Sequence, residues 1–418
     1  MSSKSQRTET TIIALLFLSL FVSKSFIYIG LILLIITQAL ILYKKRPLAT
    51  LPLPQPITRI SITLFSVGVI SSLLFTSSLS DFFTFFRKGA IFLLLPLLYY
   101  QLKRNNNAQY ASYALLVSLV IALSYAAMKI AAIGMDSWHG QRIDSFWDIG
   151  RWSELLAYSI AMTIPLIVEK SDNLKQKMLL FIFLVMSCTF LLLSGSRGPL
   201  LALMVSCSLY FIYRRPTGFF ILAFTISVCS YIAKDLPQVS VVGERIASIF
   251  DLSSNDSNNA RLAMWEQGLH YSYYLLTHAP HTFLFGTGID QFEVNFTHFL
   301  QESSNISQII KHTNHQFSFK DLHNTYLDLS VKLGFLYAMI FVLLLFSLFV
   351  AFYRELETGS VWAYSGVCLM ITYVINSLFY TSGLEYQTTI FFLMLALCHT
   401  LLIQDLAKRQ NRCSKPAS

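Results

Sequence analysis

Arg197 is the first residue of this sequence whose type and position suggest chemistry. It lies in the run LLLSGSRGPLLAL (191–203), in which every other residue is apolar or small. A charge at mid-bilayer costs about 2.5–3.5 kcal/mol on insertion scales, so an arginine near hydrocarbon pairs with another group or serves a site. The alternative is that its long side chain reaches the lipid headgroups. Gly195, Gly198 and Pro199 favour a tight turn followed by a helix start.

Four more arginines occupy connecting segments that we expect on the same side of a membrane. Arg142 and Arg151 lie in the stretch HGQRIDSFWDIGRW, and Arg245 and Arg261 lie in a long polar segment. Guanidinium groups match phosphate oxygens in a bidentate fashion. Several of them at one depth therefore predict a site for a phosphorylated lipid headgroup, with a diphosphate as the natural candidate.

His323 is the second candidate, in the stretch DLHNTYLDLSVKLGFLY (321–337). Asn324 is suited to cap a helix that starts there, and helical spacing places Tyr326 or Leu327 on the same side as His323. With an ordinary pKa near 6.5, an imidazole could accept the proton of an attacking hydroxyl at neutral pH. The alternative is that His323 only caps the helix or contacts headgroups.

Membrane helices must position these residues, because 55% of the chain is hydrophobic and only 13% is charged. In soluble proteins, roughly a quarter of the residues are charged. About twelve apolar runs are long enough to cross a hydrocarbon core of ~30 Å. They are 11–23, 26–43, 60–77, 85–102, 109–131, 152–168, 178–194, 199–213, 217–233, 324–352, 361–380 and 385–404.

The distribution of Lys and Arg predicts the orientation of these helices. The clusters fall on alternate loops and on the tail, so both termini are expected in the cytoplasm, and the net charge of +9 is mostly this topological signal. We therefore predict an all-α polytopic membrane protein with a large helical outer loop between the ninth and tenth helices. The predicted division is transmembrane helices in 1–233, the outer loop in 234–322, transmembrane helices in 323–407 and a cytoplasmic tail in 408–418.

Several function classes are disfavoured by missing patterns. No basic stripe with interleaved aromatic residues indicates a nucleic-acid partner, and no GxxxxGK[ST] motif indicates ATP use. No Asp-x-Asp triplet or grouping of His and carboxylates predicts a metal site, so we expect no metal and no cofactor. No matching pair of Gly- or Pro-broken helices indicates a transporter with inverted repeats, although a lipid or polysaccharide transporter stays an alternative.

The His323 motif resembles the signature of bacterial O-antigen ligases: His323 and Asn324, nine residues, Gly334, two residues, Tyr337. Three other features are similar to the wider family, which includes O-antigen polymerases and protein O-oligosaccharyltransferases. They are the SRG turn at 196–198, the segment from Arg261 to Trp265 followed by Pro280 and FGTG, and the large loop before the His323 motif. The likeness covers about residues 130–350 and separates ligase from polymerase poorly.

The resemblance implies an inverting, metal-independent glycosyl transfer on the periplasmic side of the bacterial inner membrane, by a fold similar to GT-C glycosyltransferases. The donor would be O-polysaccharide on undecaprenyl diphosphate, the acceptor a hydroxyl of the lipid A core, and membrane lipids would surround the chain. It implies that His323 is the base and that Arg197, Arg261 and Arg142 hold the diphosphate. Arg151 and Arg245 have no clear family counterpart; with Asn324 and Tyr326 they are candidates for support.

Overall fold

The structure is a computed structural model of the chain. It describes residues 3–43, 55–75, 79–134, 137–169, 174–217, 256–304 and 306–413, together with Phe220 and Gly243. These residues form helices and connections and no strand, so the predicted all-α class is confirmed for them.

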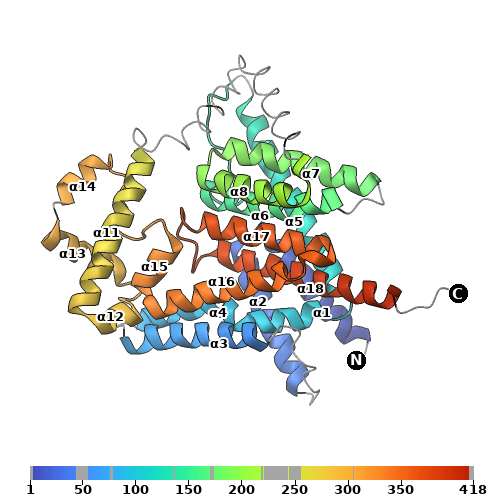
Figure 1. The fold of residues 1–418 in the computed structure, drawn as a ribbon, viewed down its shortest axis with the longest axis horizontal. Helices are drawn as coiled ribbons and strands as arrows, with labels where there is room; N and C mark the ends of the chain where they lie inside the picture. Colours follow the sequence, from blue (N-terminus) through green and yellow to red (C-terminus); the bar gives the residue numbers. More distant parts are fainter. Residues whose placement is uncertain are drawn as a thin grey trace.

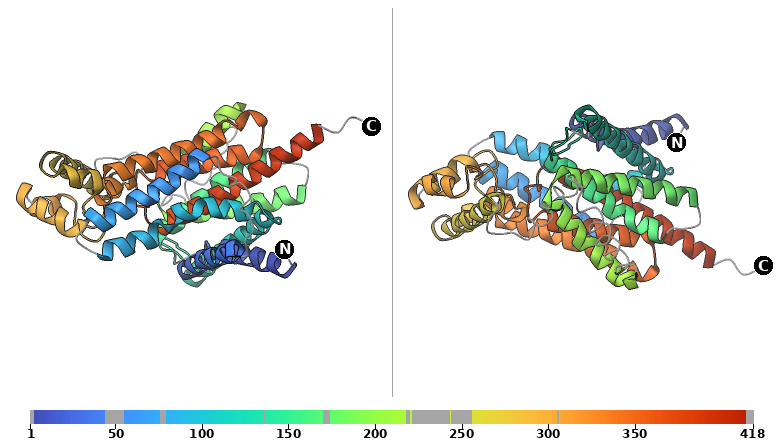
Figure 2. Two further views of the ribbon diagram at one scale, coloured as in Figure 1. Left: turned by 90° about the horizontal axis from the view of Figure 1, so that it is seen from below. Right: turned by 90° about the horizontal axis from the view of Figure 1, so that it is seen from above.

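Long helices lie side by side and form the body of the molecule (Figures 1 and 2). They are α1 (Ser3–Ser19), α2 (Lys24–Tyr43), α3 (Gln55–Ile70) with the π-helical η1 (Ser71–Phe75), α4 (Leu79–Leu102), α5 (Asn107–Ile133), α6 (Ile149–Glu169), α7 (Leu174–Ser194), α8 (Arg197–Arg214), α16 (Phe335–Tyr353), α17 (Val361–Asn376) and α18 (Tyr386–Cys413). The short helix η2 (Leu356–Thr358) links α16 to α17.

A second group of helices gathers at one end of this bundle, and α1 and the end of α18 lie toward the other (Figure 1). They are α11 (Asp256–His278), α12 (Pro280–Phe285), α13 (Phe292–Ser303), α14 (Ile306–His312) and α15 (Thr325–Lys332). We call this the α11 end. An apolar cluster separate from the bundle core holds its helices together, with Met264 and Tyr271 of α11 against Phe292 and Phe296 of α13.

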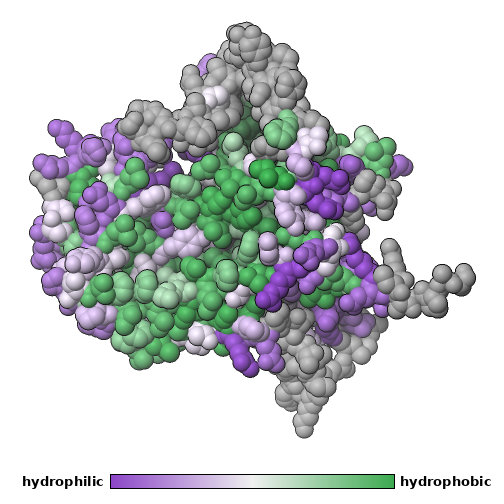
Figure 3. Space-filling model, viewed as in Figure 1, coloured by the Kyte–Doolittle hydropathy of each residue, from purple (hydrophilic) through white to green (hydrophobic). Residues whose placement is uncertain are grey.

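The bundle has the composition of a membrane-embedded structure. Among the described residues, six helices are long and apolar enough to cross a membrane, and two shorter apolar helices accompany them. Figure 3 shows hydrophobic side chains over the middle of the body and hydrophilic ones at the α11 end and near the termini. A polytopic membrane protein is thus supported. The count of about twelve spans and the domain boundaries stay predictions, and the expected span at 217–233 lies almost wholly outside the described residues.

The single helix expected at 324–352 is wrong, because the chain breaks at Gly334 between α15 and α16. A helix end leaves its last carbonyl groups without partners inside the helix. Here the backbone N–H of Thr287 donates to the Val331 carbonyl at 2.9 Å and that of Gly288 to Lys332 at 3.0 Å. The hydrogen-bond donors for the carbonyl groups at this break thus come from a segment more than forty residues away in sequence.

Two glycines allow these two backbone segments to approach each other so closely. Gly286 and Gly334 have φ of +91° and +95°, where residues with a side chain are strained. A Cβ at Gly286 would lie 2.3 Å from the Lys332 carbonyl oxygen, and one at Gly334 would lie 2.2 Å from that of Leu284. The FGTG segment is therefore a bend at which two backbones touch, and it fixes α15 at the α11 end.

Candidate active site

The connection between α17 and α18, residues 377–385, is the centre of the candidate site, and we call it the Tyr380 turn. The Tyr380 ring packs against the turn between α7 and α8, where a Cβ on Gly198 would lie 2.6 Å from a ring carbon. The Ser196 side chain also lies close enough to the Tyr380 hydroxyl to lower its pKa in part. Arg197 lies between Ser196 and Gly198 in the sequence, so the predicted SRG turn is in contact with Tyr380.

Two other predicted arginines act on the same tyrosine. The guanidinium carbon of Arg261 lies 5.6 Å from the centre of the Tyr380 ring, within the range of a cation–π interaction. Burial raises the pKa of Tyr380, whereas the nearby positive charges of Arg261 and Arg142 lower it in part. The structure therefore places Arg261 and the turn that carries Arg197 against one ring, with Arg142 near enough to act on it electrostatically.

His323 lies just before α15, near enough to Arg261 to feel its charge. Its Nδ1 is 3.3 Å from Asp321 Oδ1, its side chain is 38% exposed, and Trp265 Nε1–H donates to its carbonyl oxygen at 3.4 Å. Burial lowers the pKa of His323, with a further decrease from Arg261 and a partial increase from Asp321. The imidazole is therefore neutral at pH 7. With the proton on Nδ1, beside the Asp321 carboxylate, Nε2 is the atom that can accept a proton.

Asn324 and Thr325 fix the position of His323. The Asn324 side-chain oxygen accepts from the backbone N–H groups of Tyr326 at 3.0 Å and Leu327 at 3.1 Å, so the predicted N-cap is confirmed. His323 itself adopts a φ of +46°, outside the helix.

Thr325 ties this helix start to the Tyr380 turn. Its hydroxyl donates to the Tyr380 carbonyl at 2.7 Å and accepts from the Ser382 N–H at 2.8 Å. Its own N–H donates to the Ser377 carbonyl at 2.8 Å. These three bonds set the distance between His323 and the tyrosine that holds the arginines. Sequence reasoning assigned no role to Thr325 or Tyr380, because neither residue is charged and their importance depends on tertiary contacts.

Glu154 of α6 supports the Tyr380 turn from inside the bundle. Its carboxylate is fully buried and accepts from Ser382 Oγ at 3.0 Å, Tyr158 Oη at 3.1 Å and Gln387 Nε2 at 3.2 Å. A buried carboxylate within a predicted membrane helix is expensive and marks a functional region. The acidic residue in the run SELLAYS is therefore a signal in the sequence that points to this site, and it was not among the predicted site residues.

The residues predicted as support have different surroundings. Arg151 forms ion pairs with Asp148 and, at 3.2 Å, with Glu385, which also binds Lys88 at 2.7 Å. In contrast, no acidic side chain in the described ranges forms an ion pair with Arg142 or Arg261. The charge of Arg151 is thus already compensated.

Tyr326 and Arg245 were the other predicted supports. The Tyr326 hydroxyl donates to the Val374 carbonyl of α17 at 3.1 Å, so this side chain joins helices instead of facing His323. Arg245 lies outside the described residues.

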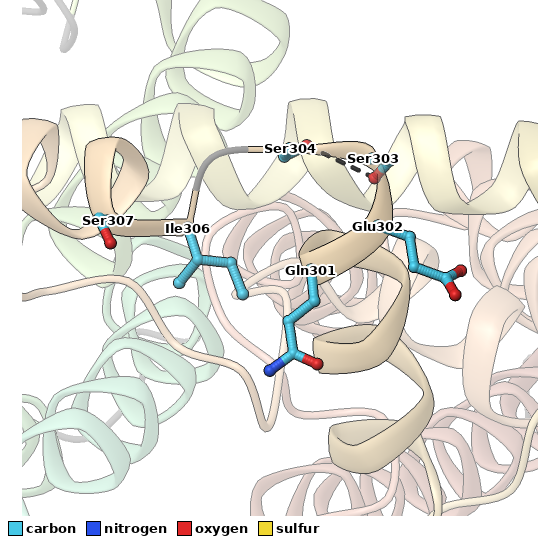
Figure 4. A pocket seen from close by; sticks show the side chains of 6 residues that line it. All are labelled: Gln301, Glu302, Ser303, Ser304, Ile306 and Ser307. Atoms are coloured by element: carbon cyan, nitrogen blue, oxygen red, sulfur yellow. Dashed lines mark hydrogen bonds between the residues drawn. The ribbon is translucent and has the colours of Figure 1, made fainter.

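A surface hollow at the connection between α13 and α14 is separate from this site (Figure 4). Gln301, Glu302, Ser303, Ser304, Ile306 and Ser307 line it, and none of them belongs to the predicted site. The carboxylate of Glu302 is the sole ionisable group in this lining, which disfavours a diphosphate there.

The fold and the site define a helical membrane protein with converging arginines beside a neutral histidine. Residues 181–342 match the family model described as O-antigen ligase. The match includes Arg197, Arg261 and His323, whereas Arg142 and Tyr380 lie outside it. No curated protein matches the chain. The resemblance found in the sequence is confirmed, and this family suggests a function of the O-antigen ligase or polymerase type.

Proposed function

We propose that this protein transfers O-polysaccharide from undecaprenyl diphosphate to a hydroxyl of the lipid A core, on the periplasmic side of the bacterial inner membrane. The observation that carries the proposal is the packing of Arg261 and the Arg197 turn against Tyr380, with Arg142 near enough to lower the pKa of Tyr380 and Arg261 near enough to lower that of His323.

The arginines would bind the diphosphate and stabilise the charge that grows on it as the glycan leaves. Cations that are fixed before the reaction, in a site with little water, do this effectively. Arg142 and Arg261 are suited to it because no described carboxylate pairs with them, so a phosphate would be their counter-ion. Arg261 is also held by the Tyr380 ring, which orients its planar group. Arg151, already neutralised by Asp148 and Glu385, is assigned to structure.

His323 would be the general base. In an inverting displacement the acceptor oxygen forms a bond to the anomeric carbon as the bond from that carbon to the diphosphate oxygen breaks. The acceptor proton moves to His323 Nε2, and the electron pair leaves with the lipid diphosphate. Asp321, at Nδ1, would hold the tautomer in which Nε2 is unprotonated and would stabilise the imidazolium that forms.

The test is transfer by the purified protein in lipid nanodiscs, with lipid-linked O-polysaccharide as donor and lipid A core as acceptor. For His323→Ala we expect a loss of at least about 100-fold in transfer, the usual size of a general-base contribution, with binding of the lipid diphosphate retained. His298→Ala is the matched control, because His298 is an exposed α13 residue that pairs with Glu302. Full transfer by His323→Ala contradicts the proposed base.

A polymerase and a protein O-oligosaccharyltransferase of the same family would use the same donor with another acceptor. The lipopolysaccharide of a strain without the protein separates the first of these from the ligase. Lipid-linked polymer beside bare core supports the ligase, whereas core that carries one repeat unit supports the polymerase. Transfer of glycan to protein in the nanodisc assay would support the oligosaccharyltransferase.

A further inference from the structure

A second cavity, of about 790 Å³, lies between α5, α6, α7, α17 and α18. Its walls use the part of α6 from Ser159 to Glu169 and the part of α18 from Met394 to Arg409. These are the halves of both helices remote from the Tyr380 turn, which contacts α6 at Gly150 and precedes α18. None of the proposed site residues lines this cavity.

Most of the cavity wall is apolar. Leu115 and Leu119 of α5, Met162 and Leu166 of α6 and Met394 of α18 form its inner part. Its serine and threonine hydroxyl groups are bonded within their own helices: Ser112 donates to Ala108, Ser159 to Leu155 and Thr163 to Ser159, each to a carbonyl. Because these donors are satisfied, the inner wall behaves as hydrocarbon and is suited to an acyl chain.

The charged residues of the wall are confined to one end of the cavity, toward the chain termini. The net charge of the lining residues at this end is positive. The two carboxylates already have partners: Asp405 pairs with Arg409 at 3.1 Å, and Glu169 pairs with Arg214 at 3.0 Å and Arg215 at 3.6 Å.

Two lysines at this mouth have no such compensation. Lys177 of α7 and Lys408 of α18 form no ion pair in the part of the chain that the structure describes. An apolar cavity with a cationic mouth is complementary to a lipid with an anionic headgroup, and basic pockets between membrane helices bind such lipids.

We propose that this cavity binds one anionic glycerophospholipid from the leaflet nearest the chain termini. Its phosphate lies between Lys177 and Lys408, and an acyl chain fills the space between α5, α6 and α18. The lipid connects α7, which ends at the turn preceding Arg197, with α18, which begins after the Tyr380 turn. It thus stabilises the bundle at the end opposite the transfer site, and the inference is independent of the proposed reaction.

The experiment measures retained lipid by native mass spectrometry of the detergent-purified full chain, with added phosphatidylglycerol, phosphatidylcholine or undecaprenyl phosphate. We expect one bound phosphatidylglycerol, an increase in melting temperature with this lipid alone, and at least a tenfold weaker affinity in the double variant Lys177→Gln, Lys408→Gln. The variant Arg7→Gln, Lys103→Gln removes the same charge elsewhere and should retain the lipid.

A third variant tests the apolar part of the cavity. Met162→Trp fills the space while leaving both lysines in place, and it should reduce lipid retention as well. Equal binding of phosphatidylglycerol and phosphatidylcholine, equal loss in both double variants, or binding of undecaprenyl phosphate alone would overturn the proposal. If Met162→Trp does not fold, the comparison of the two double variants still decides.

Discussion

Two groups of cations lie near the Tyr380 turn, and they differ in their partners. Around Glu385, Lys88 and Arg151 share a carboxylate, and Asp148 adds a second negative charge to Arg151. Near Tyr380, Arg261 lies over an aromatic ring and Arg142 acts on it electrostatically, and neither arginine pairs with a carboxylate of the described residues. Charges that compensate one another hold a structure together, whereas gathered cations without counter-ions repel one another unless an anion joins them. The difference assigns the first group to support and the second to binding.

The largest expected effect is the contrast between the two groups. Arg261→Gln should lower kcat/KM for transfer by about 100- to 1,000-fold, because it removes a charge that acts on the leaving diphosphate. Arg151→Gln should lower it by less than about tenfold, because that charge is already compensated. Both variants are assayed in nanodiscs with the same donor. A larger loss for Arg151→Gln than for Arg261→Gln would reverse the assignment.

The second prediction concerns the hydrogen bonds of Thr325 that connect the His323 segment to the Tyr380 turn. Thr325→Val keeps the volume but leaves the Tyr380 carbonyl and the Ser382 N–H without this partner, at a cost of about 1–3 kcal/mol for each unsatisfied buried group. We expect kcat to decrease about tenfold with little change in the donor KM, since the arginines are intact. Thr400→Val is the control, because Thr400 bonds only the Ala396 carbonyl of its own helix. A loss confined to KM would contradict a positioning role.

The pH dependence of kcat/KM tests the proposed role of His323 as the base. Its pKa is lowered by burial, so the unprotonated base persists to below the ordinary pKa of about 6.5. Transfer should therefore be constant at neutral pH and decrease only in more acidic buffer. Because Asp321 raises this pKa, Asp321→Asn should move the acid limb to lower pH while reducing the maximal rate. An acid limb above pH 6.5, or one that moves upward in Asp321→Asn, would contradict the assignment.

The smallest expected effect is that of metal removal. If the arginines supply all the charge that the diphosphate needs, EDTA treatment should change transfer by less than about twofold. Addition of Mg²⁺ to the treated protein is the control. Loss of transfer on chelation, restored by Mg²⁺, would show that a cation outside the protein shares this work.

Local patterns were enough to predict the helices and part of the site. The apolar runs located α4, α5 and α7, and the His323–Asn324 pair located the start of α15 with its cap. Contacts between distant segments were not predictable. The break at Gly334 depends on the backbone of Gly286, and Arg151 resembles Arg142 in sequence until Glu385, 234 residues further along, neutralises it. Tyr380 has no distinguishing pattern of its own, since its position between three cationic segments arises only on folding.

The most direct test of the account is a structure of the protein with undecaprenyl diphosphate, determined by electron cryomicroscopy in nanodiscs. We predict phosphate oxygens within about 3.2 Å of guanidinium nitrogens of Arg261 and of Arg142 or Arg197, above the Tyr380 ring and on the His323 side of α11. A diphosphate bound at Lys88 and Arg151, or away from all of these arginines, would contradict the central claim.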